Sequence, residues 1–428
     1  MSEIGHYDLQ EMQPARIRRR KTKQTRSYLR QKNIALGAIS AISEHGIAAL
    51  THRRVAKQAH VSLAATTYYY ETKNDIIKHA SQELLDQYVH AFQRFERRYA
   101  TTSERLSFRE FALKLVSNAL GRHRAVTLAW CEITLNAAHE PNLQDLTQNW
   151  FRTLNDIWQN IAHLLGEKDV GHAATSAIDT VVGFIFLLVP LGLSEDSLRT
   201  LLSSDVTDFT PSFGDDTTHP GELRKFGKKA EETRERILRC AVALLTSGEN
   251  EPLTFRKVAE QSGLTVPALT YHFSTVSDLL NAAQMRLFIE AKFRYRTVRG
   301  DVDYDSIDVD QTIDMTTKVF LREVTEHRDL SLAAYPVYIQ SSRDPRLRPG
   351  LWAINAEQWH GWSPIMTSLN PSATPFDAWF MAALFTGKLI RIIVTGGKTN
   401  ALSKVHNEFA YDLHGLVDGR HWAIQRQQ

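Results

Sequence analysis

Apolar residues recur every three or four positions along most of this 428-residue chain. Ile34, Ala38 and Ile42 follow that spacing near the beginning, and Ile237 and Ala241 follow it in the second half. A helix brings positions with this period onto one face, whereas a strand needs sustained alternation of apolar and polar residues. No sustained alternation with hairpin turns occurs, so the pattern predicts an all-α fold.

The pattern occurs twice in the chain. A shift of 203 residues carries residues 51–58 (THRRVAKQ) onto residues 254–261 (TFRKVAEQ) without a gap. A weaker likeness follows at a shift of 204 residues, which carries residues 138–143 (AHEPNL) onto residues 342–347 (SRDPRL). Internal repeats constrain an architecture before any local assignment is made. We interpret the chain as a tandem duplication whose unit spans about half of its length.

Helix signals within each copy predict two short helices joined by a tight turn. Thr254 is a good N-cap, Gly263 suits a left-handed helix end, and Thr265 can cap the next helix. Two short helices in this order form a helix-turn-helix, whose second helix enters the major groove of DNA while the first braces it. In the first copy the turn residue is His60, which can adopt the left-handed conformation at modest cost.

The run at residues 254–273 (TFRKVAEQSGLTVPALTYHF) resembles the signature of the TetR/AcrR family. Residues 51–70 are similar but looser, with His60 at the turn and three tyrosines in place of Tyr-His-Phe, so that Tyr70 would fill the packing role of Phe273. The resemblance implies a transcription regulator that binds double-stranded DNA. It also implies helical regulatory domains with a pocket for a small-molecule effector and a dimerisation surface on their late helices.

The resemblance further implies two kinds of DNA contact in each copy. Contacts with the DNA backbone are expected from Thr51, Ser62, Tyr68, Tyr69 and Lys73, and from Thr254, Thr265, Tyr271 and His272. Base readout is expected from the first exposed positions of each second helix, namely Leu63, Ala64 and Thr66, and Val266, Pro267 and Leu269. Phosphate or guanine contacts are assigned to Arg53 and Arg256. Mostly apolar readers rely on thymine methyl groups and DNA shape, and because the two sets differ we expect an imperfect palindrome.

A cluster of positive charge precedes the first helix-turn-helix. The stretch from Arg16 to Lys32 is rich in Arg and Lys and contains no Asp or Glu, although the whole chain carries a formal net charge of only +3. Such a run is usually a solvated tail, but a basic arm beside a helix-turn-helix can enter the minor groove. We therefore predict DNA contacts from Arg18, Arg19 and Arg20.

Composition and motif searches argue against other classes of protein. The two cysteines lack CxxC spacing, the histidines lack HxxxH or HExxH spacing, and no Gly-rich phosphate loop or nucleophile elbow occurs. We therefore expect no catalytic residue, no metal site and no cofactor, and the protein is not expected to be an enzyme. The apolar run at residues 181–193 contains Pro190 and is too short to span a bilayer, so we expect a cytoplasmic protein without a membrane partner.

Six segments follow from the duplication. Ser, Pro, Gly and Asp residues between 205 and 227 break the periodic pattern and predict a linker. The segments are a basic arm at 1–24, a helix-turn-helix domain at 25–80, a helical regulatory domain at 81–210, a linker at 211–229, a second helix-turn-helix domain at 230–284 and a second regulatory domain at 285–428. We call residues 25–210 copy one and residues 230–428 copy two.

The leading hypothesis is a ligand-responsive repressor whose two copies pair through their late helices, at 179–193 and 377–394, into a pseudo-dimer within one chain. The apolar run at 181–189 is interpreted as interface or core in preference to a cavity wall. An aromatic pocket in copy two is one interpretation of Tyr335, Tyr338, Trp352, Trp359 and Trp362, and core packing is the simpler one. The alternatives are a homodimer in which one head is degenerate, and a ligand- or protein-binding module that has lost DNA binding.

Overall fold

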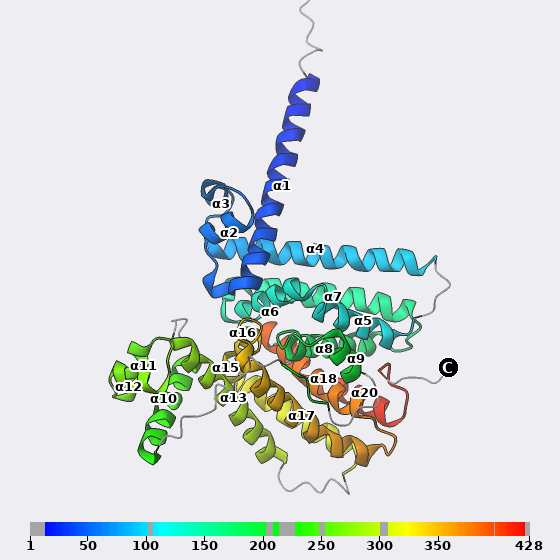
Figure 1. Ribbon diagram of the computed structural model, residues 1–428. Helices are drawn as coiled ribbons and strands as arrows, with labels where there is room; N and C mark the ends of the chain where they lie inside the picture. The colour runs from blue at the N-terminus through cyan, green and yellow to red at the C-terminus, as the bar shows by residue number, and fades with distance from the viewer. Residues whose placement is uncertain are drawn as a thin grey trace, which may run out of the picture. The chain divides into compact units, whose positions relative to one another are not determined.

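The computed structural model describes residues 13–101, 106–202, 209–213, 227–247, 253–299, 307–397 and 399–423. Every regular element in these ranges is a helix, so the prediction of an all-α fold is confirmed (Figure 1). The chain divides into two compact units, Met1–Gln87 and Tyr88–Gln428, which we call the N-terminal and C-terminal units.

The N-terminal unit contains the first predicted helix-turn-helix. Its elements are α1 (Gln13–His45), η1 (Ile47–Ala49), α2 (His52–Gln58), α3 (Leu63–Tyr69) and the first part of α4 (Lys73–Tyr99). The apolar positions that predicted the first helix are buried, because Ile34, Ala38 and Ile42 have no exposed surface and form the core with Val55 and Ile77. Packing of an amphipathic face contributes most of the stability of such helices.

The basic arm and the first helix are continuous. Residues 13–45 form the single helix α1, with Pro14 in its first turn, where proline is favourable, and no Pro or Gly follows before Gly37 (Figure 1). The predicted boundary at residue 24 therefore does not coincide with a break, and residues 1–12 lie outside the described residues. At Gly37 a Cβ atom would lie 2.6 Å from the backbone nitrogen of Ala59, so α1 and the end of α2 pack backbone to backbone.

The C-terminal unit contains the remaining helices of both copies. Those of copy one are α5 (Phe108–Leu120), α6 (Arg124–His139), η2 (Pro141–Leu143), α7 (Gln144–Leu164), α8 (Val170–Leu188) and α9 (Glu195–Leu202). Those of copy two are α10 (Lys228–Thr246), α11 (Phe255–Ser262), α12 (Val266–His272), α13 (Val276–Arg299), α14 (Val309–Thr325), α15 (Arg328–Ala334), α16 (Pro336–Gln340), η3 (Pro345–Leu347), α17 (Arg348–Leu369), α18 (Pro375–Val394), α19 (Thr399–Leu402) and α20 (Val405–Val417).

The element order of copy one recurs in copy two. The weaker sequence likeness has a structural counterpart, because η2 and η3 occupy the shifted positions and each leads directly into a long helix, α7 or α17. The helix α6 corresponds to the pair α15 and α16. Pro336 stands at the position of Glu132 in α6, and because proline lacks the N–H that continues a helix, α15 ends at Ala334.

The late helices α8 and α18 pack against each other at glycines. A Cβ atom on Gly183 would lie 1.8 Å from the carbonyl oxygen of Ala383, and a Cβ atom on Gly387 would lie 1.8 Å from the carbonyl oxygen of Asp179. The shift of 204 residues carries Asp179 onto Ala383 and Gly183 onto Gly387. The two contacts are therefore the same contact made twice, which is the pattern of a two-fold interface.

A buried charge network lies beside this crossing. Lys388 Nζ lies 2.8 Å from Asp179 Oδ2, and the side chains of both residues are fully buried. Arg391 donates to both oxygens of Asp179, at 2.6 and 2.9 Å, and Glu408 of α20 accepts from Lys388 and Arg391 at 2.7 and 2.9 Å. Burial by itself would raise the pKa of Glu408, but the two cations lower this pKa to about 2.

The network has no counterpart in copy one. The positions of Lys388 and Arg391 in α18 correspond to Phe184 and Leu187 in α8, which are buried and apolar. The α8–α18 crossing is therefore symmetric in its backbone and asymmetric in its charge. A pair of α8 helices would hold Asp179 without these cations, and a pair of α18 helices would hold the cations without Asp179.

The apolar helix α8 lies largely inside the C-terminal unit. Among the described residues, one helix, α8, is long and apolar enough to cross a membrane, but 72% of its most apolar window is buried inside the protein. Its apolar run packs against α18, as the interpretation of residues 181–189 as interface or core predicted.

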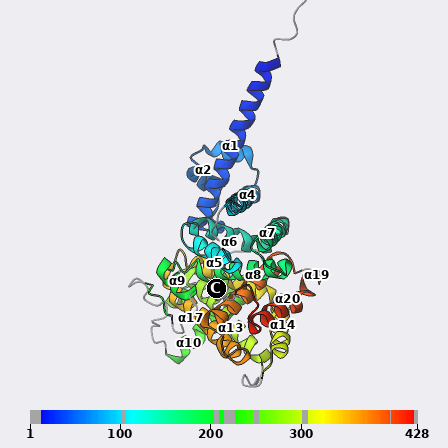
Figure 2. The same cartoon turned by 90° about the vertical axis from the view of Figure 1, so that its right-hand side faces the viewer.

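Helices α14 (yellow-green) and α20 (red) lie side by side, joined by His406–Asp314 at 3.1 Å and His414–Asp310 at 3.2 Å (Figure 2).

Candidate nucleic-acid interfaces and ligand cavity

Four hydroxyl side chains cap the short helices of the two helix-turn-helix motifs. Each accepts a hydrogen bond from the backbone amide three residues ahead, at 3.2 Å for Thr51 and Ser62, 3.3 Å for Thr254 and 3.4 Å for Thr265. An N-cap of this kind fixes the first turn of its helix. A hydroxyl that accepts from the helix still carries its own proton, so these side chains can also donate to a phosphate oxygen.

The turns of the two motifs have the same backbone geometry. Gly263 has φ of 64° and His60 has φ of 52°, so the prediction that His60 adopts the left-handed conformation is confirmed. The amide after each turn residue bonds back at 3.0 Å, from Val61 to the carbonyl of Ala56 and from Leu264 to that of Ala259. A residue with a Cβ atom costs about 1–2 kcal/mol in this conformation, so copy one keeps the turn under strain.

The second helices, α3 and α12, present matching outer faces. Leu63 is 50% exposed and Val266 is 40% exposed, and Ala64 and Pro267 at the following positions are exposed as well. On the bracing helices α2 and α11, Arg53 and Arg256 are exposed. These predicted contact residues are therefore all accessible to a DNA groove or backbone.

The prediction of base readout is wrong for two residues. Thr66 and Leu269 have no exposed surface, since Thr66 donates to the carbonyl oxygen of Leu63 at 2.8 Å and Leu269 belongs to the core of its motif. The exposed residues at this level are Thr67 and Thr270. Each helical residue turns by about 100°, so the fifth position of α3 or α12 shares a face with the first and second, and the fourth turns inward. The same periodicity could have identified them from the sequence.

The aromatic residues that end α3 and α12 divide into an outer and an inner group. Tyr68 is 81% exposed and Tyr271 is 58% exposed, and each meets its half-buried neighbour, Tyr69 or His272, edge to face. Burial, and next the charge of Arg234, lower the pKa of His272, so this imidazole is neutral near pH 7. Neutral His272 can contribute a hydrogen bond to DNA but not a fixed positive charge.

Tyr70 fills the packing position of Phe273, as predicted. Both side chains are buried in their motifs. The hydroxyl of Tyr70 donates to the carbonyl oxygen of Gln31 at 3.4 Å and also hydrogen-bonds His79 Nδ1, and burial raises the pKa of this phenol to about 12. The extra oxygen of copy one is therefore satisfied by α1 and α4, and it needs no contact with DNA.

The other predicted contacts lie at the edges of the first motif. Lys73 is half-buried at the beginning of α4. Arg18, Arg19 and Arg20 fall in the first turns of α1, and their side chains lie outside the described residues.

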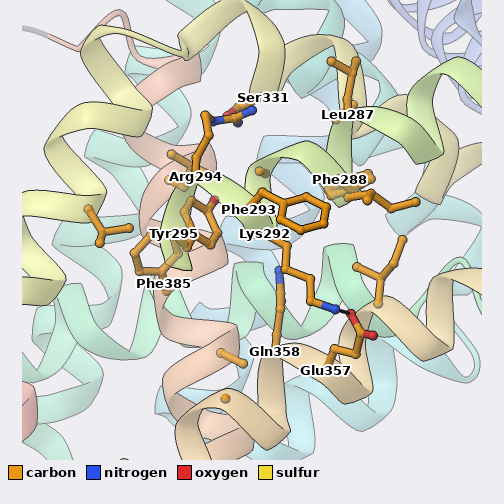
Figure 3. Close-up of a pocket in the computed structure, with 18 of the residues that line it drawn as sticks. Leu287, Phe288, Lys292, Phe293, Arg294, Tyr295, Ser331, Glu357, Gln358 and Phe385 are labelled. Carbon is orange, nitrogen blue, oxygen red and sulfur yellow. Dashed lines mark hydrogen bonds and ion pairs between the residues drawn. The ribbon is translucent and has the colours of Figure 1, made fainter. Parts of the chain in front are cut away.

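A cavity of about 670 Å³ lies in the regulatory part of copy two. Helices α13, α14, α15, α17 and α18 supply its walls, and the labelled rings of Phe288, Phe293, Tyr295 and Phe385 appear among them in Figure 3. Of the aromatic residues named from the sequence, Tyr335 and Trp362 line this cavity. Tyr338, Trp352 and Trp359 are buried in the core, as the simpler interpretation of these residues held.

The charged groups on the cavity wall have partners of opposite charge. Arg294 binds Glu323 through two hydrogen bonds, at 2.9 and 3.0 Å, and Ser331 donates to the same carboxylate at 3.2 Å. Lys292 of α13 forms an ion pair with Glu357 of α17, shown as a dashed line in Figure 3. An aromatic pocket in copy two was one interpretation of the sequence, but most of the residues that line this cavity were not among those named for it. A residue-by-residue comparison of the two copies could have pointed to it, because several bulky residues of copy one are smaller in copy two.

One buried cluster near the C-terminus has the composition of a hydrolytic triad but another geometry. His421 Nε2 lies 3.1 Å from Asp412 and 3.5 Å from Ser176 Oγ, while His421 Nδ1 accepts from the amide of Ala423 at 3.2 Å. In a triad the two ring nitrogens face the acid and the nucleophile separately. Here one nitrogen faces both, so the cluster ties the C-terminal segment to α8. Among the described residues, no group of three His, Cys, Asp or Glu side chains is arranged to hold a metal ion.

Comparison with known proteins identifies the regulatory parts. The family model described as "Tetracyclin repressor-like, C-terminal domain" matches the chain twice, at residues 103–208 and 308–419. The first match contains α5–α9 and the second contains α14–α20, and together they cover half of the chain. None of the curated proteins compared with the chain matches it. The repeat therefore extends through the regulatory helices, and each match contains one of the two late helices that cross at glycines.

Proposed function

The chain belongs to the TetR-like family of transcription regulators, and on that premise we propose that it is a ligand-responsive repressor that binds DNA as a single-chain pseudo-dimer. It would act in the cytoplasm, with double-stranded DNA and a small-molecule effector as its partners. The observation that carries this proposal is the equivalence of the two helix-turn-helix motifs. Both have capped helices, a left-handed turn and an exposed outer face on the second helix.

The corrected faces define the proposed DNA contacts. Base edges would be read by Leu63, Ala64 and Thr67 in copy one and by Val266, Pro267 and Thr270 in copy two. Both sets end in threonine but differ before it, so the two half-sites would be related without being identical. Tyr68 and Tyr271 would donate to phosphate oxygens, and Arg53 and Arg256 would add charge beside them.

The pseudo-dimer is supported by the crossing of α8 and α18. Each late helix belongs to a different copy, and Gly183 and Gly387 make equivalent close contacts. The charge network of Asp179, Lys388 and Arg391 suits this unlike pair only. In a family whose late helices form dimers, the second subunit of the dimer would here be supplied by the same chain.

A connection between cavity and DNA-binding head supports the proposed ligand response. Helix α13 begins at Val276, soon after α12, and its later residues line the cavity. Near its middle, Arg286 forms an ion pair with Glu235 of α10 at 2.8 Å, and Gln284 donates to the carbonyl oxygen of Ala333 at 3.1 Å. A ligand that binds one position of α13 more tightly would shift the orientation of the second head and release the operator.

The proposal is tested by selecting binding sites from a random pool of DNA duplexes with the purified full-length chain. We expect enrichment of sites with two related but unequal half-sites at a fixed spacing. A strictly symmetric site would contradict the proposed asymmetric readout. Absence of any enriched sequence would instead favour a ligand- or protein-binding module without DNA recognition.

The selected site then permits a test of single contacts. Tyr68→Phe and Tyr271→Phe should each weaken binding by about 0.5–1.5 kcal/mol, the usual worth of one hydrogen bond, measured by fluorescence anisotropy. Tyr99→Phe, at the C-terminal end of α4 and outside both helix-turn-helix motifs, is the matched control and should leave the Kd unchanged. A loss for Tyr271→Phe alone would favour the alternative in which copy one is a degenerate head.

A further inference from the structure

The cavity of copy two lies where copy one is filled by aromatic rings. The shift of 203 residues relates α4 to α13, and the shift of 204 relates α5 to α14 and α7 to α17. In copy one the corresponding helices meet through Tyr88, Phe92, Phe111, Trp150 and Trp158. Ring centroids are 4.4 Å apart for Tyr88–Phe92, 5.7 Å for Phe92–Phe111, 5.6 Å for Phe111–Trp158 and 6.2 Å for Tyr88–Trp150.

Copy two has smaller or more flexible residues at three of these positions. Ala291 replaces Tyr88, Met315 replaces Phe111 and Ile354 replaces Trp150, and all three replacements line the cavity. The helices that bear them are retained, so the volume of the missing rings is left open. Interiors are close-packed, and space of this size persists only where the surrounding helices cannot collapse into it.

Two aromatic residues are retained but in a new role. Trp158 of copy one is 1% exposed, whereas its counterpart Trp362 lines the cavity and is partly exposed. Phe92 likewise corresponds to Tyr295 on the cavity wall. The rings that pack against other rings in copy one are therefore available to a ligand in copy two.

The wall chemistry defines the class of ligand. Arg294 is neutralised by Glu323 and Lys292 by Glu357, so the wall presents no excess charge of either sign from these groups. Gln358 stands where copy one has Leu154 and adds one amide to a mostly aromatic and aliphatic wall. A charged ligand would have to compete with an existing ion pair for its partner, whereas an uncharged aromatic ligand would bury its rings without that competition.

We propose that each chain binds one small-molecule ligand, in copy two only, and that this ligand is an uncharged, largely apolar aromatic compound. The cavity volume of about 670 Å³ falls in the usual range of small-molecule sites. In copy one the corresponding space is filled by aromatic side chains. The role of this ligand as an effector rests on the proposed function, but its binding and its stoichiometry do not.

The test uses two fluorescent probes with the same ring system and the full-length chain without DNA. N-phenyl-1-naphthylamine is uncharged, and 1-anilinonaphthalene-8-sulfonate carries one negative charge. We expect the uncharged probe to bind at one site per chain in a calorimetric titration, with the sulfonate about tenfold weaker or more. Two equivalent sites per chain would overturn the assignment to copy two, and tighter binding of the sulfonate would overturn the ligand class.

Reciprocal substitutions locate the site. Ile354→Trp and Ala291→Tyr each restore a ring of copy one inside the cavity and should weaken the uncharged probe about tenfold or more. The matched control is Tyr88→Ala in copy one, which should leave the Kd of the first site unchanged. Thermal melts of all variants identify any that fail to fold, and unchanged binding by folded Ile354→Trp and Ala291→Tyr would refute the proposal.

Release of DNA is measured separately with the wild-type chain. Binding of one probe per chain without any change in operator affinity would contradict the proposed ligand response and leave the one-site proposal standing. Operator release by a compound that binds at two sites per chain would support the proposed ligand response and contradict the one-site proposal.

Discussion

Copy one and copy two are built from corresponding helices but differ in where each is strained or open. Copy one holds a left-handed histidine in its turn and a solid aromatic cluster in its regulatory part. Copy two holds the favourable glycine in its turn and a cavity of about 670 Å³ in its regulatory part. In a dimer of identical chains both features would be duplicated. In a single chain the two copies can differ, so that one contains a cavity and the other is packed with aromatic rings.

The largest expected effect comes from the crossing of the late helices. Gly183→Ala places a Cβ atom 1.8 Å from a backbone oxygen that no side-chain rotation can move. We expect a loss of about 3 kcal/mol or more in the free energy of unfolding, at the upper end for overpacking, measured in urea. Gly171→Ala, on the same helix with no neighbour closer than 3.9 Å, is the control and should stabilise by about 0.5–1 kcal/mol. Equal effects of the two substitutions would mean that α8 and α18 are not in close contact.

The second-largest loss of stability is expected from a change in the buried charge network of Asp179, Lys388, Arg391 and Glu408. Asp179→Asn removes the anion that faces two buried cations, and leaving a buried charge uncompensated costs about 3 kcal/mol or more. Asp196→Asn, which breaks an exposed pair with Arg199, is the control and should cost less than about 1 kcal/mol. A small loss for Asp179→Asn would show that the network does not hold the unlike helices together.

A pH dependence follows from Glu408 in the same network. Its pKa in the folded state is lowered to about 2, below the ordinary value of 4.5, so its contribution to stability is present above pH 4.5 and is lost as the pH falls toward 2. The amount is on the order of 3 kcal/mol. Urea unfolding of wild type and Glu408→Gln should therefore converge as the pH is lowered through this range. A difference that stays constant from pH 6 to pH 2 would contradict the assignment.

The smallest effects distinguish the two turns. His60→Gly relieves the left-handed strain of copy one and should stabilise the N-terminal unit by about 1 kcal/mol. Gly263→Ala introduces the same strain into copy two, where nothing lies within 4 Å of the new Cβ atom, and should destabilise by a similar amount. Hydrogen exchange of α2 and α11 reports each motif separately. Destabilisation by His60→Gly would show that the imidazole stabilises the motif by more than the left-handed conformation of His60 costs.

Much of the fold was predictable because local signals and the repeat agree. The caps Thr254 and Thr265, the turn at His60 and the inward position of Tyr70 follow from helix chemistry and a gapless shift. The error at Thr66 and Leu269 arose because exposure was assigned by order along the helix. The helical period turns these two residues inward and places Thr67 and Thr270 on the outer face.

Other features depend on contacts that no local pattern encodes. Asp179 and Lys388 are 209 positions apart, and their pairing requires the crossing angle of α8 and α18. The continuity of α1 through the basic arm removes a boundary that charge alone suggested. The cavity required a comparison of corresponding residues in the two copies, because Ala291 and Ile354 are ordinary helical residues by themselves.

In the proposed pseudo-dimer, one chain supplies both halves of the DNA-binding pair. The most direct measurement is the mass of the complex between the full-length protein and its selected operator, determined by sedimentation or native mass spectrometry. We expect one 48.7 kDa chain for each duplex. Two chains for each duplex, at concentrations just above the Kd, would contradict it and establish a homodimer instead.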